Sequence, residues 1–332
     1  MNDLFCVSEN VTKIERIRPH VIILSKKENI IYGYGNNEYK QIVDSKEKYI
    51  DKRFCEILNF KTKIMDVKCG IDFSLFLDEH GEIYFKGNLE HFSFNINENG
   101  KILDIPRVKT ISCGFYHIAL IDYNNNLWTD GDNRYGQVYD KLSEQDIKSS
   151  LKIILKECES VSCGSFHTMA VDSNHKLFGW GNNDFFQLSD HHRTNLNEID
   201  VGFPVKNIFC CFKYSIIEDF ENYFYILGCI HGYLNPKVKK IGTKKYTHIE
   251  LFLDSFFSVA CDNSIYIYNI NCKRGDFSIG AFKEFEFIEN RIKSMDYLKI
   301  SGVGLTDIGI NGSSKYCKIY KNIERCYRTN RK

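Results

Sequence analysis

Short apolar segments alternate with polar turns along most of the chain. The segments 117–122 (HIALID) and 167–172 (HTMAVD) are apolar up to a closing aspartate, and each runs into a polar turn. A second short segment rich in aromatic residues follows, such as LFGWG at 177–181. Apolar runs of this length, bounded by turn residues, are typical of strands. The pattern therefore predicts a β-hairpin that recurs along the chain.

The aspartate and the glycines of each hairpin have mechanical explanations. A short carboxylate at the start of a turn can accept hydrogen bonds from turn amides that would otherwise be unsatisfied. Glycines after the second segment allow a tight bend or a close approach of backbones. One segment, 144–157 (EQDIKSSLKIILKE), has helical periodicity instead. We expect it to form a helix or a long connection between units.

The hairpin belongs to a longer internal repeat. The segments 111–137 and 161–187 share Cys, Gly, His, Asp, Gly, Asn and Gln at identical offsets, and weaker copies keep some of these marks. The cysteine position gives an anchor for each copy, with Arg16 and two leucines replacing it in the weak ones. A period of about 40 to 50 residues built from short strands predicts a β-propeller. The seven anchors lie at positions 16, 69, 113, 163, 210, 253 and 298.

Composition supports a single intracellular domain. The chain has 332 residues, 43% of them hydrophobic, with 44 Lys and Arg against 43 Asp and Glu, so no global charge attracts nucleic acid or lipid. No apolar run approaches the ~20 residues of a membrane helix, and no linker divides the chain. Thirteen cysteines without framework spacing fit reduced thiols. We expect one domain over 1–332, nuclear or cytoplasmic, with no membrane contact.

The unit V-S-C-G-x-x-H-x-x-x-h-D, followed by L-F-G-W-G-N-N-x-x-x-Q-L, resembles the repeat of the RCC1 (regulator of chromosome condensation) family. The resemblance implies an all-β, seven-bladed propeller that spans nearly the whole chain. It also implies a ring closed by strands from both chain ends. The candidates for that closure are Leu4 to Val7 and Lys315 to Tyr320.

Two Cys-x-x-x-His pairs, Cys113 with His117 and Cys163 with His167, suggest zinc, since thiolate and imidazole are its common ligands. The pairs fall in different repeats, however, and other copies replace the histidine or the cysteine, so a metal set and a catalytic pair are both disfavoured. The segment GYGNN after Tyr32 lacks the third glycine of a dinucleotide fingerprint. We expect buried cysteines, hydrogen-bonded histidines, and no metal or cofactor.

In the RCC1 family the G-x-x-H loops lie on one rim, and in the founding member acidic and histidine residues of several such loops contact the small GTPase Ran. Asp72 matches that pattern best, being the acidic residue just before the histidine position; a solvated loop carboxylate is its alternative interpretation. By position, the candidates for a partner-binding rim are Arg18, His20, Asp72, Tyr116, His117, Phe166, His167 and Lys213.

The resemblance implies a protein-binding platform, with guanine-nucleotide exchange on a Ran-type GTPase as its most specific function. The alternative is a noncatalytic adaptor or scaffold in ubiquitin ligation, cytoskeletal regulation, or organelle or ribosome assembly. No hydrolase, transferase or oxidoreductase chemistry is expected. The β-wedge of the exchange factor and its chromatin-binding N-terminal tail have no evident counterpart. A C-terminal tail, 318–332, carries six basic residues against one acidic and is interpreted as solvated, with phosphate contact as the alternative.

Overall fold

The computed structural model describes residues 20–25, 30–56, 60, 62–138, 148–189, 196–230, 233–243, 245–251, 256–261, 265–268, 279–281 and 298–301. Within these ranges the chain forms strands, turns and loops, and contains no helix. It follows that no helix of the described part is long and apolar enough to cross a membrane.

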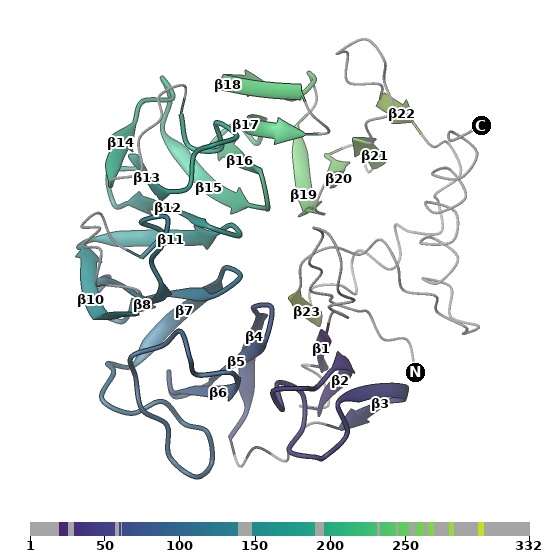
Figure 1. Ribbon diagram of the computed structural model, residues 1–332. Coiled ribbons are helices and arrows are strands. Elements are labelled where there is room, and N and C mark those ends of the chain that lie inside the picture. Colours follow the sequence, from purple (N-terminus) through teal and green to yellow (C-terminus); the bar gives the residue numbers. More distant parts are fainter. Residues whose placement is uncertain are drawn as a thin grey trace.

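Six antiparallel sheets follow one another around a common centre (Figure 1). The second sheet has three strands and the others have four. The first three sheets have the orders β23-β1-β2-β3, β4-β5-β6 and β10-β9-β8-β7. Their strands are β1 (His20–Ser25), β2 (Ile30–Asn36), β3 (Tyr49–Glu56), β4 (Ile64–Cys69), β5 (Phe73–Asp78), β6 (Ile83–Gly87), β7 (Val108–Cys113), β8 (His117–Asp122), β9 (Leu127–Asp132), β10 (Lys148–Leu155) and β23 (Leu298–Ser301).

The next three sheets are formed by consecutive strands, in the orders β11-β12-β13-β14, β15-β16-β17-β18 and β19-β20-β21-β22. This architecture is the all-β propeller that the sequence predicts, and each sheet is one blade. The strands are β11 (Cys158–Cys163), β12 (His167–Asp172), β13 (Leu177–Gly181), β14 (Asn197–Ile199), β15 (Val205–Cys210), β16 (Tyr214–Asp219), β17 (Phe224–Ile230), β18 (Tyr233–Lys240), β19 (Tyr246–Leu251), β20 (Phe256–Ala260), β21 (Ile265–Tyr268) and β22 (Ile279–Ala281).

The apolar core lies between the blades. Five clusters of buried side chains fill the five contacts between successive sheets. In β8, Ile118 and Leu120 pack toward the second blade, while Ala119 and Ile121 pack toward the fourth. Successive residues of a strand point to opposite faces of its sheet, so a strand between two neighbouring blades buries both sets. Every residue of β8 is buried for this reason.

The aspartate that closes the second strand of a hairpin caps its turn, as predicted. Asp122 Oδ1 accepts the amides of Asn124 and Asn126, both at 2.8 Å, and Asp172 Oδ1 accepts those of Asn174 and Lys176, both at 2.9 Å. The same arrangement recurs at the turns that begin with Asp78 and Asp219.

The turns also join each blade to the next. One turn residue has a positive φ, as at Asn125 (62°) and His175 (62°). Its carbonyl accepts an amide from the first strand of the following blade: Cys158 N–H donates to Asn125 and Val205 N–H donates to His175, at 2.8 and 3.0 Å. The left-handed turn therefore directs a carbonyl that would otherwise lack a partner across the blade boundary.

The prediction of a helix or long connection at 144–157 is wrong where the structure describes it. Residues from Lys148 to Leu155 form β10, which pairs with β9 through a register with two irregularities. The backbone groups along the outer edge of β9 need partners, and a further strand supplies them. Ser149, Ser150, Ile153 and Ile154 fit a strand as well as they fit a helix face.

The two segments expected to close the ring, Leu4 to Val7 and Lys315 to Tyr320, lie outside the described residues. Among the described residues, β23 begins at the seventh anchor, residue 298, and pairs with β1 (Figure 1). A strand from the C-terminal part of the chain is thus the first strand of the first blade, in the order β23-β1-β2-β3. The described residues form six sheets, and the count of seven blades stays a prediction.

Candidate protein-binding face

Three of the predicted rim histidines lie inside the propeller. His20, His117 and His167 are completely buried. A Cβ atom placed on Gly114 would lie 2.0 Å from Cε1 of His117, and one placed on Gly164 would lie 2.0 Å from Cε1 of His167. The glycine of each C-G-x-x-H loop is therefore required because the imidazole lies against its backbone. These three side chains do not reach the surface of the loops that carry them.

Each of these imidazoles binds a hydroxyl of the next blade. Nε2 of His117 lies 3.0 Å from Oγ1 of Thr168, and Nε2 of His167 lies 3.0 Å from Oγ of Ser215. Each hydroxyl donates its single hydrogen to a glutamine carbonyl, at Gln137 and Gln187 respectively, both within 2.9 Å. The hydroxyl must then accept from the imidazole, which fixes the neutral Nε2–H tautomer. His20, Ser74 and Gln41 repeat the arrangement.

Burial favours the neutral form of all three histidines. It lowers the pKa of His20 and of His117 to about 4, and that of His167 to about 3. Within the described part of the chain, Nδ1 of His117 and of His167 has no hydrogen-bond partner, so a proton added there would remain unsatisfied. The three imidazoles hold neighbouring blades together as neutral groups.

The loops that follow β4, β7, β11 and β15, the first strands of four blades, form a hydrogen-bonded belt. We call the surface that these loops present the belt face. The amide of Ile71 donates to the carbonyl of Phe115 (3.0 Å), the amide of Phe115 donates to Ser165 (3.2 Å), and the amide of Ser165 donates to Cys211 (3.3 Å). Four consecutive blades, the second to the fifth, are joined in this way. The residues that come next in each loop therefore have fixed positions relative to one another.

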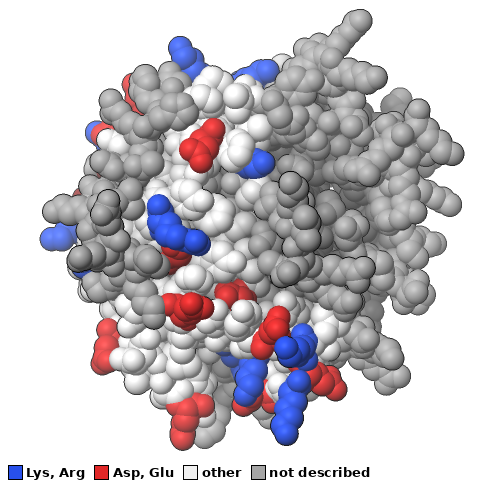
Figure 2. Space-filling view, viewed as in Figure 1, with Lys and Arg blue, Asp and Glu red and all other residues white. Residues whose placement is uncertain are grey.

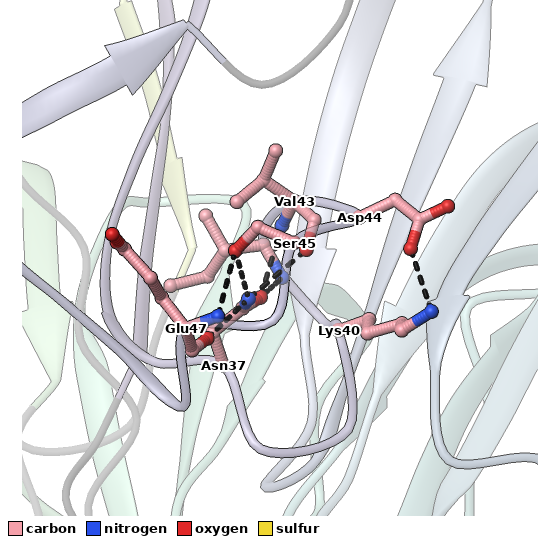
Figure 3. Close-up of polar contacts among 7 residues, drawn as sticks. Asn37, Lys40, Val43, Asp44, Ser45 and Glu47 are labelled. Carbon is pink, nitrogen blue, oxygen red and sulfur yellow. Dashed lines mark hydrogen bonds and ion pairs between the residues drawn. The ribbon is translucent and has the colours of Figure 1, made fainter.

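A second set of loops, between the third and fourth strands, is held by asparagine. Oδ1 of Asn37 accepts the amides of Ile42 and Val43, both at 3.0 Å, and its Nδ2 donates to the carbonyls of Val43 and Glu47 (Figure 3). Asn133 and Asn183 accept equivalent amides in the third and fourth blades. Both sets of loops are thus internally organised, which reduces the entropy that binding a partner would cost.

The other predicted rim residues lie at or near the surface of the belt. Tyr116 and Phe166 are half-buried, as is Lys213. The ring of Tyr116 lies 4.7 Å from that of His91, centroid to centroid. Burial, together with the nearby charge of Asp72, raises the pKa of Tyr116. Arg18 lies outside the described residues.

Asp72 is more buried than a solvated loop carboxylate. Its residue exposure is 7%, and Oδ2 accepts a hydrogen bond from Nδ2 of Asn88 at 3.0 Å, while Oδ1 has no partner among the described residues. Burial raises its pKa, and the hydrogen bond from Asn88 and the charge of His91 act in the opposite direction. The carboxylate is therefore held at the belt with one oxygen unsatisfied.

Aromatic residues that the sequence reasoning missed complete this face. Four aromatic residues contact the predicted ones: Phe115, Phe212, Tyr135 and Phe185. The ring centroids of Phe115 and Phe166 are 5.2 Å apart, and Nζ of Lys213 lies 4.3 Å from the centroid of Phe185. A signal for two of them was present, because an aromatic residue stands two positions before the glutamine in three copies, as Tyr39, Tyr135 and Phe185.

The buried cysteines of the described part are structural. Burial raises the pKa of Cys163 and Cys210 to about 12. A thiol with so high a pKa stays protonated at neutral pH and is a poor nucleophile. The charged groups visible in the described surface are interspersed, and neither sign covers it (Figure 2).

Comparisons with known proteins agree on the repeat. The profile of the regulator of chromosome condensation (RCC1) repeat matches residues 108–137 and 158–187. The mouse serine/threonine-protein kinase Nek9 is 26% identical over 156 residues, which are 40% of this chain and only 16% of the kinase.

Solved structures resemble the fold over about three quarters of the chain. Human WBSCR16 superimposes with a TM-score of 0.63 at 16% identity, over 79% of this chain and 77% of that one. Yeast RCC1 (Prp20), solved bound to Kap60, gives 0.62 at 18% identity, over 75% and 67%. Prp20p of Saccharomyces cerevisiae, described with its binding properties to Gsp1p and histones, gives 0.59 at 16% identity, over 75% and 69%. The chain therefore carries RCC1 repeats at 108–137 and 158–187, and its fold resembles that of the RCC1 propellers.

Proposed function

We propose that this propeller is a protein-binding platform and that its belt face promotes guanine-nucleotide exchange on a Ran-type small GTPase. The observation that carries the proposal is the hydrogen-bonded belt, which holds Asp72, Tyr116, Phe166 and Lys213 in fixed succession on neighbouring loops. The likeness of the fold to Prp20p of Saccharomyces cerevisiae, described with its binding properties to Gsp1p, supports the choice of partner class.

Exchange by such a face requires no covalent chemistry. A platform that binds the nucleotide-free GTPase more tightly than the loaded one lowers the affinity for nucleotide by the same factor, because the two binding equilibria are linked. A preference of 10⁴ corresponds to about 5.5 kcal/mol. The organised loops favour this role because little of the contact energy is spent on ordering them.

Asp72 is the side chain that we assign to recognition of a basic group on the GTPase. Its carboxylate is held at the belt by Nδ2 of Asn88, and burial raises its pKa, so a basic group of the partner would stabilise the charged form. We assign no contact role to His117 or His167, because both imidazoles are completely buried between blades.

That burial is also the observation that favours the second candidate, a noncatalytic adaptor. The acidic and histidine contact set that the family resemblance implies is reduced to Asp72 on the described face. An adaptor would use the same face for a partner without releasing a nucleotide.

The test is the release of a fluorescent guanine nucleotide from a Ran-type GTPase, with the propeller at one tenth of the GTPase concentration. We expect release well above the intrinsic rate and at least tenfold slower catalysis by Asp72→Asn. The matched control is Glu198→Gln, an exposed carboxylate on β14 that pairs with Lys176 and should change nothing. Release at the intrinsic rate would reject exchange and leave the adaptor function.

A further inference from the structure

An aromatic row crosses the belt face over three blades. We define the row as Tyr135, Phe166, Phe115 and Phe212, in order of contact. The ring centroids of Tyr135 and Phe166 are 5.0 Å apart, those of Phe166 and Phe115 are 5.2 Å apart, and those of Phe115 and Phe212 are 5.7 Å apart. The row is continuous although its members are far apart in sequence.

The row is distinct from the propeller core. None of its four members belongs to the five clusters that fill the contacts between blades. Phe115 is buried within the row, Phe166 and Phe212 are half-buried, and Tyr135 is 40% exposed. The row therefore lies outside the main apolar core between the blades. Partly exposed aromatic side chains that rest on a rigid base are the usual anchors of protein interfaces.

Backbone strain beside the row points the same way. In three equivalent loops the residue before the glutamine has a positive φ: Lys40 (60°), Gly136 (76°) and Phe186 (60°). Glycine adopts this conformation freely, whereas a bulky residue costs roughly 1–2 kcal/mol. The fourth blade nevertheless carries phenylalanine there, next to Phe185. A strained aromatic residue that remains half-buried at a loop is evidence of a role outside stability.

The side chain of Lys213 places a positive charge beside the row. The ammonium of Lys213 lies 4.3 Å from the centroid of Phe185 and 4.9 Å from that of Phe212. In the described part of the chain, no carboxylate forms an ion pair with Lys213. Arg134, the other cation beside the row, is already held by Asp132 at 2.8 Å. Lys213 thus keeps unused hydrogen-bond donors above an apolar surface.

We propose that the aromatic row is a docking surface for an acidic, apolar peptide segment of a protein partner. An aspartate or glutamate of the segment pairs with Lys213, and flanking large apolar side chains pack on Phe166 and Phe212. Charge complementarity selects this occupant, because Lys213, beside the row, has no counterion among the described residues, while Arg134 has one in Asp132. The inference rests on the proposed use of the belt face for protein binding.

The test is a selection of random 12-residue peptides displayed on phage, with the whole chain as bait and the Lys213→Glu variant for counter-selection. Enriched peptides should combine Asp or Glu with Leu, Phe or Trp. The best peptide, labelled with fluorescein, should bind Lys213→Glu and Phe166→Ala at least tenfold more weakly than the parent chain. Lys213→Met, which keeps the apolar stem, should also weaken binding, and unchanged thermal unfolding will confirm that these variants fold.

The matched control is Lys240→Glu. Lys240 also lies over an aromatic ring, 3.1 Å from the centroid of Tyr223, but outside the row, so binding should not change. Enrichment of basic peptides, binding that ignores Lys213, failure to enrich any peptide, or self-association of the chain through the row would each overturn the inference. Nucleotide exchange without peptide selection would refute the docking surface alone, and peptide selection without exchange would refute the exchange function alone.

Discussion

The substitution Thr168→Val tests whether the buried histidine contacts hold the blades together. Thr168 is completely buried, accepts from Nε2 of His117 and donates to the carbonyl of Gln137 at 2.8 Å. Valine has nearly the same shape but no hydroxyl, so it leaves both of these groups without a partner. A buried group left unsatisfied costs about 1–3 kcal/mol, so two such groups cost roughly 2–6 kcal/mol. Such a loss is large beside the ~5–15 kcal/mol of a typical domain.

The chain itself supplies the compensating variant. At the contact between the second and third blades, Phe73 and Ile118 stand where other blades have histidine and a hydroxyl, and both are completely buried. The space against the loop glycine accepts either a phenylalanine or a histidine ring, since a Cβ on Gly70 would lie 2.0 Å from Phe73 Cε1, as a Cβ on Gly114 would lie 2.0 Å from His117 Cε1. The double variant His117→Phe/Thr168→Val should therefore be more stable than Thr168→Val alone, by about 1–3 kcal/mol, because only the Gln137 carbonyl then lacks a partner.

The assay is urea unfolding followed by circular dichroism, with the free energy of unfolding compared at constant m-value. A Thr168→Val variant that loses less than about 0.5 kcal/mol, or a double variant no more stable than that single one, would refute the interpretation of these contacts.

Three further predictions concern stability. The free energy of unfolding, measured by urea titrations, should fall as the pH drops from about 6.5 to about 4, because the three buried histidines take up protons in this range only when the chain is unfolded. Burial raises the pKa of Asp72 and of Asp130, so these two groups act in the opposite direction at lower pH. A free energy of unfolding that does not change with pH would contradict this prediction. Gly164→Ala should cost at least about 3 kcal/mol of stability, because its Cβ would lie 2.4 Å from a carbonyl oxygen. Gly202→Ala should cost only about 1 kcal/mol, which is the cost of its positive φ, because its Cβ meets no atom within 4 Å. Equal costs for the two variants would show that the close contact at Gly164 is unimportant. Asp122→Ala removes the acceptor of the Trp128 indole N–H, which lies at 2.9 Å, and should lower the free energy of unfolding by about 1–3 kcal/mol. The tryptophan fluorescence emission should shift as well, and unchanged emission would contradict this prediction.

The repeat made much of the fold predictable. Positions that recur at fixed offsets were assigned to strands, and β8, β12 and β13 begin and end where the apolar segments do. The aspartates cap their turns because this contact is local. The segment that forms β10 was misjudged because its side chains fit two periodicities, and the decision between them came from the unpaired edge of β9, which no local pattern reveals.

The candidate site was predictable only in part. The loops were placed on a rim by family resemblance, but the sequence does not say on which side of a loop a side chain lies. His167 and Phe166 are neighbours, yet one is completely buried against the next blade and the other is half-buried on the belt. The aromatic row depends on contacts between loops of three blades, separated by up to 97 positions between Phe115 and Phe212, which a pattern within one copy cannot show.

The central claim is that the belt face recognises a Ran-type GTPase and prefers its nucleotide-free state. The most direct measurement is the dissociation constant of the propeller for that GTPase, in its nucleotide-free form and in its GDP-bound form, by surface plasmon resonance at one salt concentration. We predict binding at least 100-fold tighter to the nucleotide-free form, and a clear loss of that preference in Asp72→Asn. Equal affinity for the two forms, or no binding to either, would contradict the claim.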